Sequence, residues 1–135
     1  MTLRTAACCC GQLRIAVRGE PRGVGVCHCL ACQARTGSVF AALARFDAPW
    51  SVSGDASEYV REGDGGARFR FRFCPVCGSN LFHTEEGVDD GAVSVAVGGF
   101  GDSDFPAPRV SVYECRRHGW VRLPDGISRH DRDPS

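Results

Sequence analysis

The sequence contains no lysine, and all sixteen of its basic residues are arginine. Schiff-base chemistry and a lysine general base are therefore excluded. Sixteen acidic residues balance the arginines, so no net charge attracts the chain to nucleic acid or to an anionic membrane. No apolar run approaches the roughly 18 residues of a membrane span, and the first seven residues lack the apolar stretch of a secretory signal. We therefore expect a cytoplasmic protein with no membrane partner.

Cysteine is the residue type in which this chain is rich. The 135 residues include nine cysteines, and all except Cys115 lie in three tight clusters. An odd number of cysteines, grouped closely in a chain without an export signal, argues for metal binding rather than disulfides. Metal ligation also supplies folding free energy directly, which helps a chain with seventeen glycines to fold.

The first and third clusters together predict a closed zinc site. Cys8 and Cys10 are two positions apart, and Cys74 and Cys77 form a Cys-Pro-x-Cys-Gly knuckle. Two such pairs supply the four sulfurs of a tetrahedral structural zinc. In an extended segment alternate residues share a side, so Cys9 should point away as a small buried or half-exposed residue.

The middle cluster predicts a zinc site of a different kind. Cys27, Cys29 and Cys32 offer three sulfurs, and three protein ligands with one vacant position is the pattern of a catalytic zinc. His28 should point the opposite way by strand alternation. Two alternatives stay open at this point: a metal-free redox cluster, or a site closed by a fourth protein ligand. The candidates for that fourth ligand are Cys115, His83, His118 and Cys9.

An open three-thiolate zinc favours one class of chemistry. Three thiolates leave the site with a formal charge of about −1, so it is a weaker Lewis acid than a three-histidine zinc, and a soft sulfur suits its fourth position. Metal coordination lowers the pKa of a substrate thiol from about 8.5 to below neutrality. We therefore expect thiolate addition to, or release from, a small electrophilic carbon such as an aldehyde. Activation of water is less suited to this set of ligands.

The apolar residues repeat mainly with a period of two. Leu13, Ile15 and Val17 alternate with polar or small residues, and residues 68–73 alternate arginine with phenylalanine. The pattern over residues 68–73 predicts a strand with a phenylalanine face in the core and an arginine face in solvent. Weaker strand patterns cover residues 24–27, 38–46, 57–61, 80–83, 92–97 and 109–114.

Turn residues separate these strands, at positions 18–21, 63–66, 86–91 and 98–108. Helical structure is expected only over residues 30–36, with Gly37 as its C-terminal stop, and residues 128–135 should be frayed. Many short strands predict a mainly β, antiparallel fold, in one domain over residues 1–135.

The chain resembles the glutathione-dependent formaldehyde-activating enzymes, a family that includes the vertebrate centromere protein V. The resemblance runs from about Cys8 to about Gly126. Its motifs are Cys-x-Cys-Gly, then Cys-His-Cys-x-x-Cys followed by Thr36-Gly37, then Phe-Cys-Pro-x-Cys-Gly, and Trp-Val-Arg-Leu-Pro-Asp-Gly near the end.

The resemblance implies a β-tent fold of antiparallel sheets and two zinc ions per chain. Cys8, Cys10, Cys74 and Cys77 would hold the structural zinc, and Cys27, Cys29 and Cys32 the catalytic one. It also implies a carbon–sulfur lyase that condenses formaldehyde with glutathione to S-hydroxymethylglutathione.

No motif specifies glutathione itself. Its two carboxylates would need arginine partners, and His83 or His118 could move protons. The available arginines are Arg35, Arg45, Arg116 and Arg117.

Two other function classes compete with catalysis. A zinc-stabilised protein-interaction module would use the same cysteines without reacting, and a fourth protein ligand at the middle cluster would favour it. Nucleic-acid binding is the weakest, since strand alternation separates the arginines of residues 68–73 from the phenylalanines.

Overall fold

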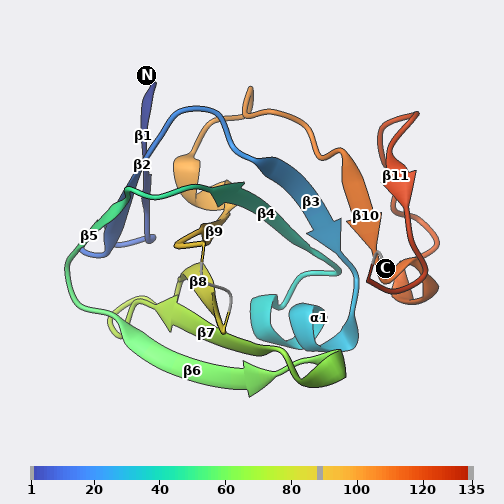
Figure 1. The fold of residues 1–135 in the computed structure, drawn as a ribbon, viewed down its shortest axis with the longest axis horizontal. Coiled ribbons are helices and arrows are strands. Elements are labelled where there is room, and N and C mark those ends of the chain that lie inside the picture. Colours follow the sequence, from blue (N-terminus) through green and yellow to red (C-terminus); the bar gives the residue numbers. More distant parts are fainter. Residues whose placement is uncertain (1, 88–89, 134–135) are drawn as a thin grey trace.

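The strand expected around Ile15 and Val17 forms as β2 (Arg14–Arg18), in the middle of a three-stranded antiparallel sheet. Its neighbours are β1 (Leu3–Ala7) and β5 (Ser51–Ser53), at the left of the molecule in Figure 1. Leu13, Ile15 and Val17 are fully buried. Their apolar face is the reason that this segment forms a half-buried strand. This computed structural model describes residues 2–87 and 90–133.

A second, eight-stranded sheet makes up most of the molecule. Its strands, in their order across the sheet, are β11 (Ser128–Arg129), β10 (Val110–Val112), β3 (Gly23–Cys27), β4 (Ala41–Phe46), β9 (Val93–Ala96), β8 (Asn80–Glu86), β7 (Arg68–Phe73) and β6 (Ser57–Glu62). The predicted mainly β class is confirmed. The expectation of antiparallel pairing throughout is wrong at β10, which runs parallel to both β3 and β11. The long connection before β10, which includes a short 3₁₀ helix (Val97–Phe100), brings the chain back beside β3 in the same direction.

The predicted helix forms as α1 (Leu30–Thr36) and ends as expected. Gly37 adopts φ 72° and its N–H donates to the Gln33 carbonyl at 2.8 Å. The strand expected over residues 38–46 begins only at β4, because the Thr36 hydroxyl accepts from the Ser38 N–H and holds that segment in a turn. No helix in the described residues is long and apolar enough to cross a membrane.

Three strands were not expected: β1, β5 and β11. β11 pairs with β10 in a segment that was predicted to be frayed, so that expectation is wrong for Ser128–Arg129. Two short 3₁₀ helices, Asp64–Gly66 and Glu114–Arg116, follow β6 and β10. The predicted turn at 86–91 includes residues 88 and 89, and the predicted frayed end includes 134 and 135; these four lie outside the described residues.

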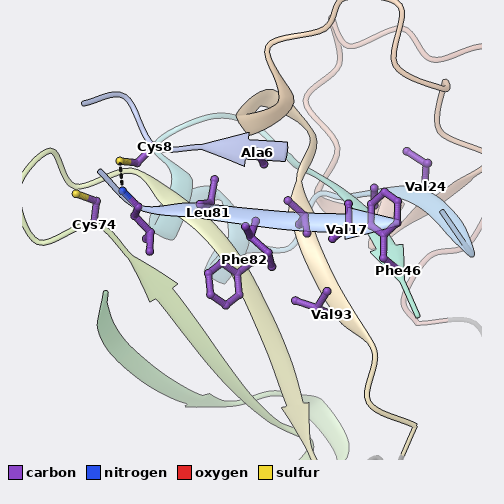
Figure 2. Packing of buried hydrophobic residues seen from close by; sticks show 13 residues of the cluster. Ala6, Cys8, Val17, Val24, Phe46, Cys74, Leu81, Phe82 and Val93 are labelled. Atoms are coloured by element: carbon purple, nitrogen blue, oxygen red, sulfur yellow. Dashed lines mark hydrogen bonds between the residues drawn. The ribbon is translucent and has the colours of Figure 1, made fainter. Parts of the chain in front are cut away.

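One face of the eight-stranded sheet packs against the three-stranded sheet and forms the core. The strand register aligns Val24, Ala44, Val95 and Phe82 across four neighbouring strands, and all four are buried. Figure 2 shows Cys8 and Cys74 at one end of this apolar cluster. The first and third cysteine clusters therefore close the end of the core.

The opposite face of the eight-stranded sheet lines a cavity. In this register Arg45, Ser94, His83 and Phe71 form a row across β4, β9, β8 and β7. In Figure 1, α1 lies between the β3–β4 pair and the β6–β7 pair. Phe69 and Phe71 of β7 line this cavity. Phe71 is buried, as expected of a core residue, but both lie outside the main core cluster, so the expectation that this face packs into the core is wrong for the cluster between the two sheets. Alternation shows which residues share a face of a strand, but it does not show whether that face packs into the core or lines a cavity.

Candidate active site

The four cysteines predicted to form a closed site come together. Cys8, Cys10, Cys74 and Cys77 have their sulfurs within 4.8 Å of one another. The Cys10 sulfur lies 3.6 Å from that of Cys8 and 3.7 Å from that of Cys74. A tetrahedral zinc with Zn–S bonds of about 2.3 Å requires sulfurs about 3.8 Å apart. This donor set therefore fits zinc. Cys9 lies outside the group, as alternation predicted, but it is exposed rather than buried or half-exposed.

Polar groups that the sequence did not single out surround these sulfurs. The Gln12 side-chain amide donates to the Cys74 sulfur at 3.1 Å, as do the backbone N–H groups of Val76 and Cys77 at 3.3 and 3.4 Å. The Leu13 backbone N–H donates to the Cys8 sulfur at 3.3 Å. Figure 2 draws this hydrogen bond at Cys8 as a dashed line. Hydrogen bonds of this kind stabilise thiolate sulfurs, the form that binds metal.

Ser79 links this group to its neighbour Cys9. The Cys9 N–H donates to the Ser79 hydroxyl oxygen at 2.9 Å, which leaves the hydroxyl proton free for the Cys77 sulfur at 3.3 Å. This hydrogen bond lowers the pKa of Cys77 to about 5. Cys77 is exposed, so Ser79 keeps the one solvent-facing sulfur of the knuckle in its metal-binding form.

The middle cluster forms where β3 ends and α1 begins. Cys27 ends β3, Cys29 is the N-cap of α1, and Cys32 lies in its first turn, with the three sulfurs within 4.8 Å of one another. The Cys29 sulfur accepts the Cys32 N–H at 3.3 Å. It is thus both the helix cap and a candidate metal ligand.

The three sulfurs share protons unequally. The pKa of Cys29 falls to about 2 because the thiols of Cys27 and Cys32 and the Cys32 N–H donate to it; the positive charge of Arg61 adds to the effect. The same hydrogen bonds raise the pKa of Cys27. The cluster therefore stabilises a thiolate, which is the requirement for binding a metal.

None of the candidates for a fourth ligand joins this cluster in the part of the chain that the structure describes. The His118 ring lies against the Gln33 side-chain oxygen at 2.9 Å, and Cys9 lies beside the four-cysteine group without belonging to it. Cys115 is exposed and lines the cavity without joining the three sulfurs. His28 points away as predicted: it is fully buried, with its Nε2 2.9 Å from the Ser111 hydroxyl.

The cysteine cluster opens into a cavity of about 790 Å³. Its walls come from α1, the cavity face of the eight-stranded sheet and the segment after β10. Of the arginines proposed from the sequence, Arg35, Arg45 and Arg116 line the cavity, whereas Arg117 binds Glu114 at 3.2 Å instead. Arg61, which no motif in the sequence singled out, also lines the cavity, because the register of β6 places it beside Phe69 on the same face.

His83 lies in this cavity among aromatic and cationic side chains. Its ring packs against Phe71 at 4.8 Å and, edge-on, against Phe69 at 5.7 Å between ring centroids. Burial lowers the pKa of His83 to about 3, and the positive charges of Arg35, Arg45 and Arg61 add to this effect. His83 is therefore uncharged at neutral pH, and the positive charge of this region belongs to the arginines.

Acidic side chains also line this cavity. The Tyr113 hydroxyl, just after β10, lies 2.7 Å from a carboxylate oxygen of Asp64 and 3.3 Å from one of Asp133. Its hydrogen bonds with them raise the pKa of Tyr113. Glu85, opposite Phe69 in the register of β8, is the third acidic residue of the lining. The cavity thus offers both cationic and anionic surroundings beside the cysteines.

A comparison with protein-family models identifies the family of this chain. The model described as glutathione-dependent formaldehyde-activating enzyme matches residues 3–116. The chain belongs to this family. The match spans the three cysteine clusters and ends within the short helix after β10. A search of the curated proteins finds no significant match.

A similar fold is found among solved structures. A crystal structure of a Rhodobacter sphaeroides protein superposes with a TM-score of 0.55 at 20% sequence identity, over 93% of this chain and 98% of that chain. At this identity the likeness shows a shared fold. Both cysteine groups lie within the residues that the family model matches. Both offer the soft sulfur donors that zinc prefers.

Proposed function

We propose that this chain is a zinc-dependent carbon–sulfur lyase that forms and breaks down S-hydroxymethylglutathione. The observation that carries the proposal is the three-cysteine cluster: it opens into a cavity of about 790 Å³, and among the described residues no fourth ligand atom joins the three sulfurs within 4.8 Å. Family membership supplies the substrates, glutathione and formaldehyde. We expect this activity in a reducing compartment such as the cytoplasm, where the thiols stay free.

The two cysteine groups have different roles in this proposal. Cys8, Cys10, Cys74 and Cys77 hold a structural zinc at the end of the core, and Cys27, Cys29 and Cys32 hold the catalytic zinc. When bound there, zinc supplies a position at which a substrate thiol loses its proton.

The protein residues then bind and orient the two substrates. In the forward direction the glutathione thiol loses its proton and its sulfur forms a bond to the formaldehyde carbon. The carbonyl oxygen gains one proton and becomes a hydroxyl, so the reaction neither releases nor consumes protons overall. Arg35 and Arg61 provide positive charge beside the reacting sulfur, which favours its thiolate form. Phe69, Phe71 and neutral His83 form the wall against which the adduct packs.

The direct test is exchange spectroscopy with ¹³C-formaldehyde and glutathione. The zinc-loaded protein should increase the exchange rate between free formaldehyde and its glutathione adduct above the spontaneous rate. The Cys32→Ser variant should lose this increase, and Cys9→Ser is the matched control because Cys9 is exposed and outside both groups. If the zinc-loaded protein leaves the exchange rate unchanged, the lyase proposal fails and the interaction-module alternative takes its place.

A further inference from the structure

Two arginines that contact the same phenylalanine ring line the cavity beside the cysteine cluster. Arg35 extends from α1 and Arg61 from β6, and their guanidinium carbons lie 4.3 and 5.4 Å from the centroid of the Phe71 ring. Cation–π contact holds each guanidinium in place. It leaves the hydrogen-bonding capacity of both unused, because an aromatic face accepts such bonds only weakly.

These guanidinium groups are unpartnered in the described part of the chain. The Nε and Nη2 atoms of Arg35 and the Nε atom of Arg61 are buried with no hydrogen-bond acceptor, and neither side chain forms an ion pair with a described acidic residue. Arg45 and Arg72 of the eight-stranded sheet also have an unpaired buried Nε, but each forms an ion pair: Arg45 with Asp90 at 3.3 Å, and Arg72 with Glu58 at 3.1 Å. Two half-buried cations with buried, unpaired nitrogen atoms and no counterion are costly unless a ligand supplies one.

The acidic residues of the cavity do not fill this need. Asp64 and Asp133 are engaged by the Tyr113 hydroxyl, and Glu85 makes no ion pair with either arginine. Arg35 is one helical turn from Cys32, and both line the same cavity as Cys29 and Arg61. A single small molecule can therefore reach the cysteine cluster and the arginines together.

We propose that Arg35 and Arg61 form a carboxylate-binding subsite, and that the enzyme selects thiols that carry a carboxylate. The planar guanidinium matches a carboxylate through paired N–H donors, and such charge-assisted hydrogen bonds are about twice as strong as neutral ones. This inference rests on the proposed function only in naming glutathione, which has two carboxylates, as the thiol. The same preference for a thiol with a carboxylate is expected for any other small thiol that binds at the cysteine cluster.

The test compares the binding of charged and uncharged thiols to the zinc-loaded protein by titration calorimetry. The probes are glutathione and its diethyl ester, and 3-mercaptopropionate and 3-mercaptopropionamide. The variants are Arg35→Gln and Arg61→Gln. Arg72→Gln is the matched control, since Arg72 is also half-buried on β7 but lies outside the cavity lining.

Wild-type protein and Arg72→Gln should bind the acid of at least one pair ten-fold or more tightly than its neutral partner. Each cavity variant should lose most of that preference while binding the neutral thiol as before. Equal binding of acid and neutral thiol in both pairs, binding of none of the four, or a preference that survives in both cavity variants would overturn the inference. A retained acid preference without catalysis of formaldehyde exchange would instead refute the proposed function alone.

Discussion

At the scale of single residues, Cys29 combines two roles that serine can separate. Its sulfur caps α1 by accepting the Cys32 N–H, and it belongs to the three-cysteine cluster. Serine is among the preferred N-cap residues, so a serine at this position can keep the cap while removing a metal-binding sulfur. Cys74 differs because it is fully buried and its sulfur accepts three N–H groups.

We therefore predict opposite outcomes for Cys29→Ser and Cys74→Ser. Cys29→Ser should remove one of two zinc equivalents and change the free energy of unfolding by less than about 1 kcal/mol, because the cap survives. Cys74→Ser should destabilise the fold by more than about 4 kcal/mol, because metal ligation and core packing fail together. Metal analysis and urea unfolding measure both effects. Equal loss of stability in the two variants would refute the division into structural and catalytic sites.

The acid sensitivity of the fold should depend on His83. Its pKa is about 3 when folded against an ordinary value of 6.5, so below pH 6.5 the unfolded chain binds a proton that the folded protein does not. Stability contributed by the neutral ring is therefore complete above pH 6.5 and is lost as the pH falls toward 3. His83→Gln lacks this titration, so from pH 7 to 5 its free energy of unfolding should fall by about 2 kcal/mol less than that of the wild type. Parallel pH profiles for the two proteins would contradict the buried, neutral state of His83.

At the scale of elements, the sequence predicted which segments form strands better than how they are arranged. Alternation identified β2 and β7 because their apolar residues recur every second position. β1 was missed because only part of its surface is buried and its residues do not alternate clearly. The neighbours of each strand come from long-range pairing, which alternation cannot reveal.

The candidate site was predictable to a similar degree. Close spacing fixed the membership of the three-cysteine cluster and of each pair in the four-cysteine group, because ligands a few residues apart must lie near each other. That the two distant pairs meet was inferred from the four sulfurs that a tetrahedral zinc needs. Arg61 had no local signal, since it lies in a mostly polar strand and reaches the cavity through its pairing with Phe69. The single-domain assignment over residues 1–135 and the catalytic role of the three cysteines stay predictions.

The connection between β5 and β6 depends on a close approach that only glycine allows. A Cβ at Gly54 would lie 1.9 Å from the Gln12 carbonyl oxygen, and φ there is 92°. We predict that Gly54→Ala lowers the free energy of unfolding by at least about 3 kcal/mol, because strain and overlap add. Gly101 is the matched control: its φ is also positive, at 62°, but its Cβ would meet nothing within 4 Å. Gly101→Ala should therefore lose only about 1 kcal/mol. Equal losses in urea unfolding would show that the overlap at Gly54 relaxes freely.

At the scale of the whole molecule, the four-cysteine group joins distant parts of the chain. Cys8 and Cys10 follow β1 of the three-stranded sheet, whereas Cys74 and Cys77 follow β7 of the eight-stranded sheet. A metal held there links both sheets at the end of the shared core (Figure 2). The three-cysteine cluster lies within one short segment between β3 and the first turn of α1, so a metal there links little else.

This difference predicts that metal removal occurs in two stages. As chelator is added, zinc from the three-cysteine cluster should leave first, because it has fewer ligands and opens into the cavity, and the β-sheet circular dichroism signal should persist. Loss of the second zinc should coincide with cooperative unfolding, since ligation there supplies folding free energy. A chromogenic chelator and circular dichroism follow both events in one titration, and Cys29→Ser should show the second stage alone. If the β-sheet signal is lost with the first zinc, the metal near the cavity also holds the fold together, and the roles assigned to the two groups are wrong.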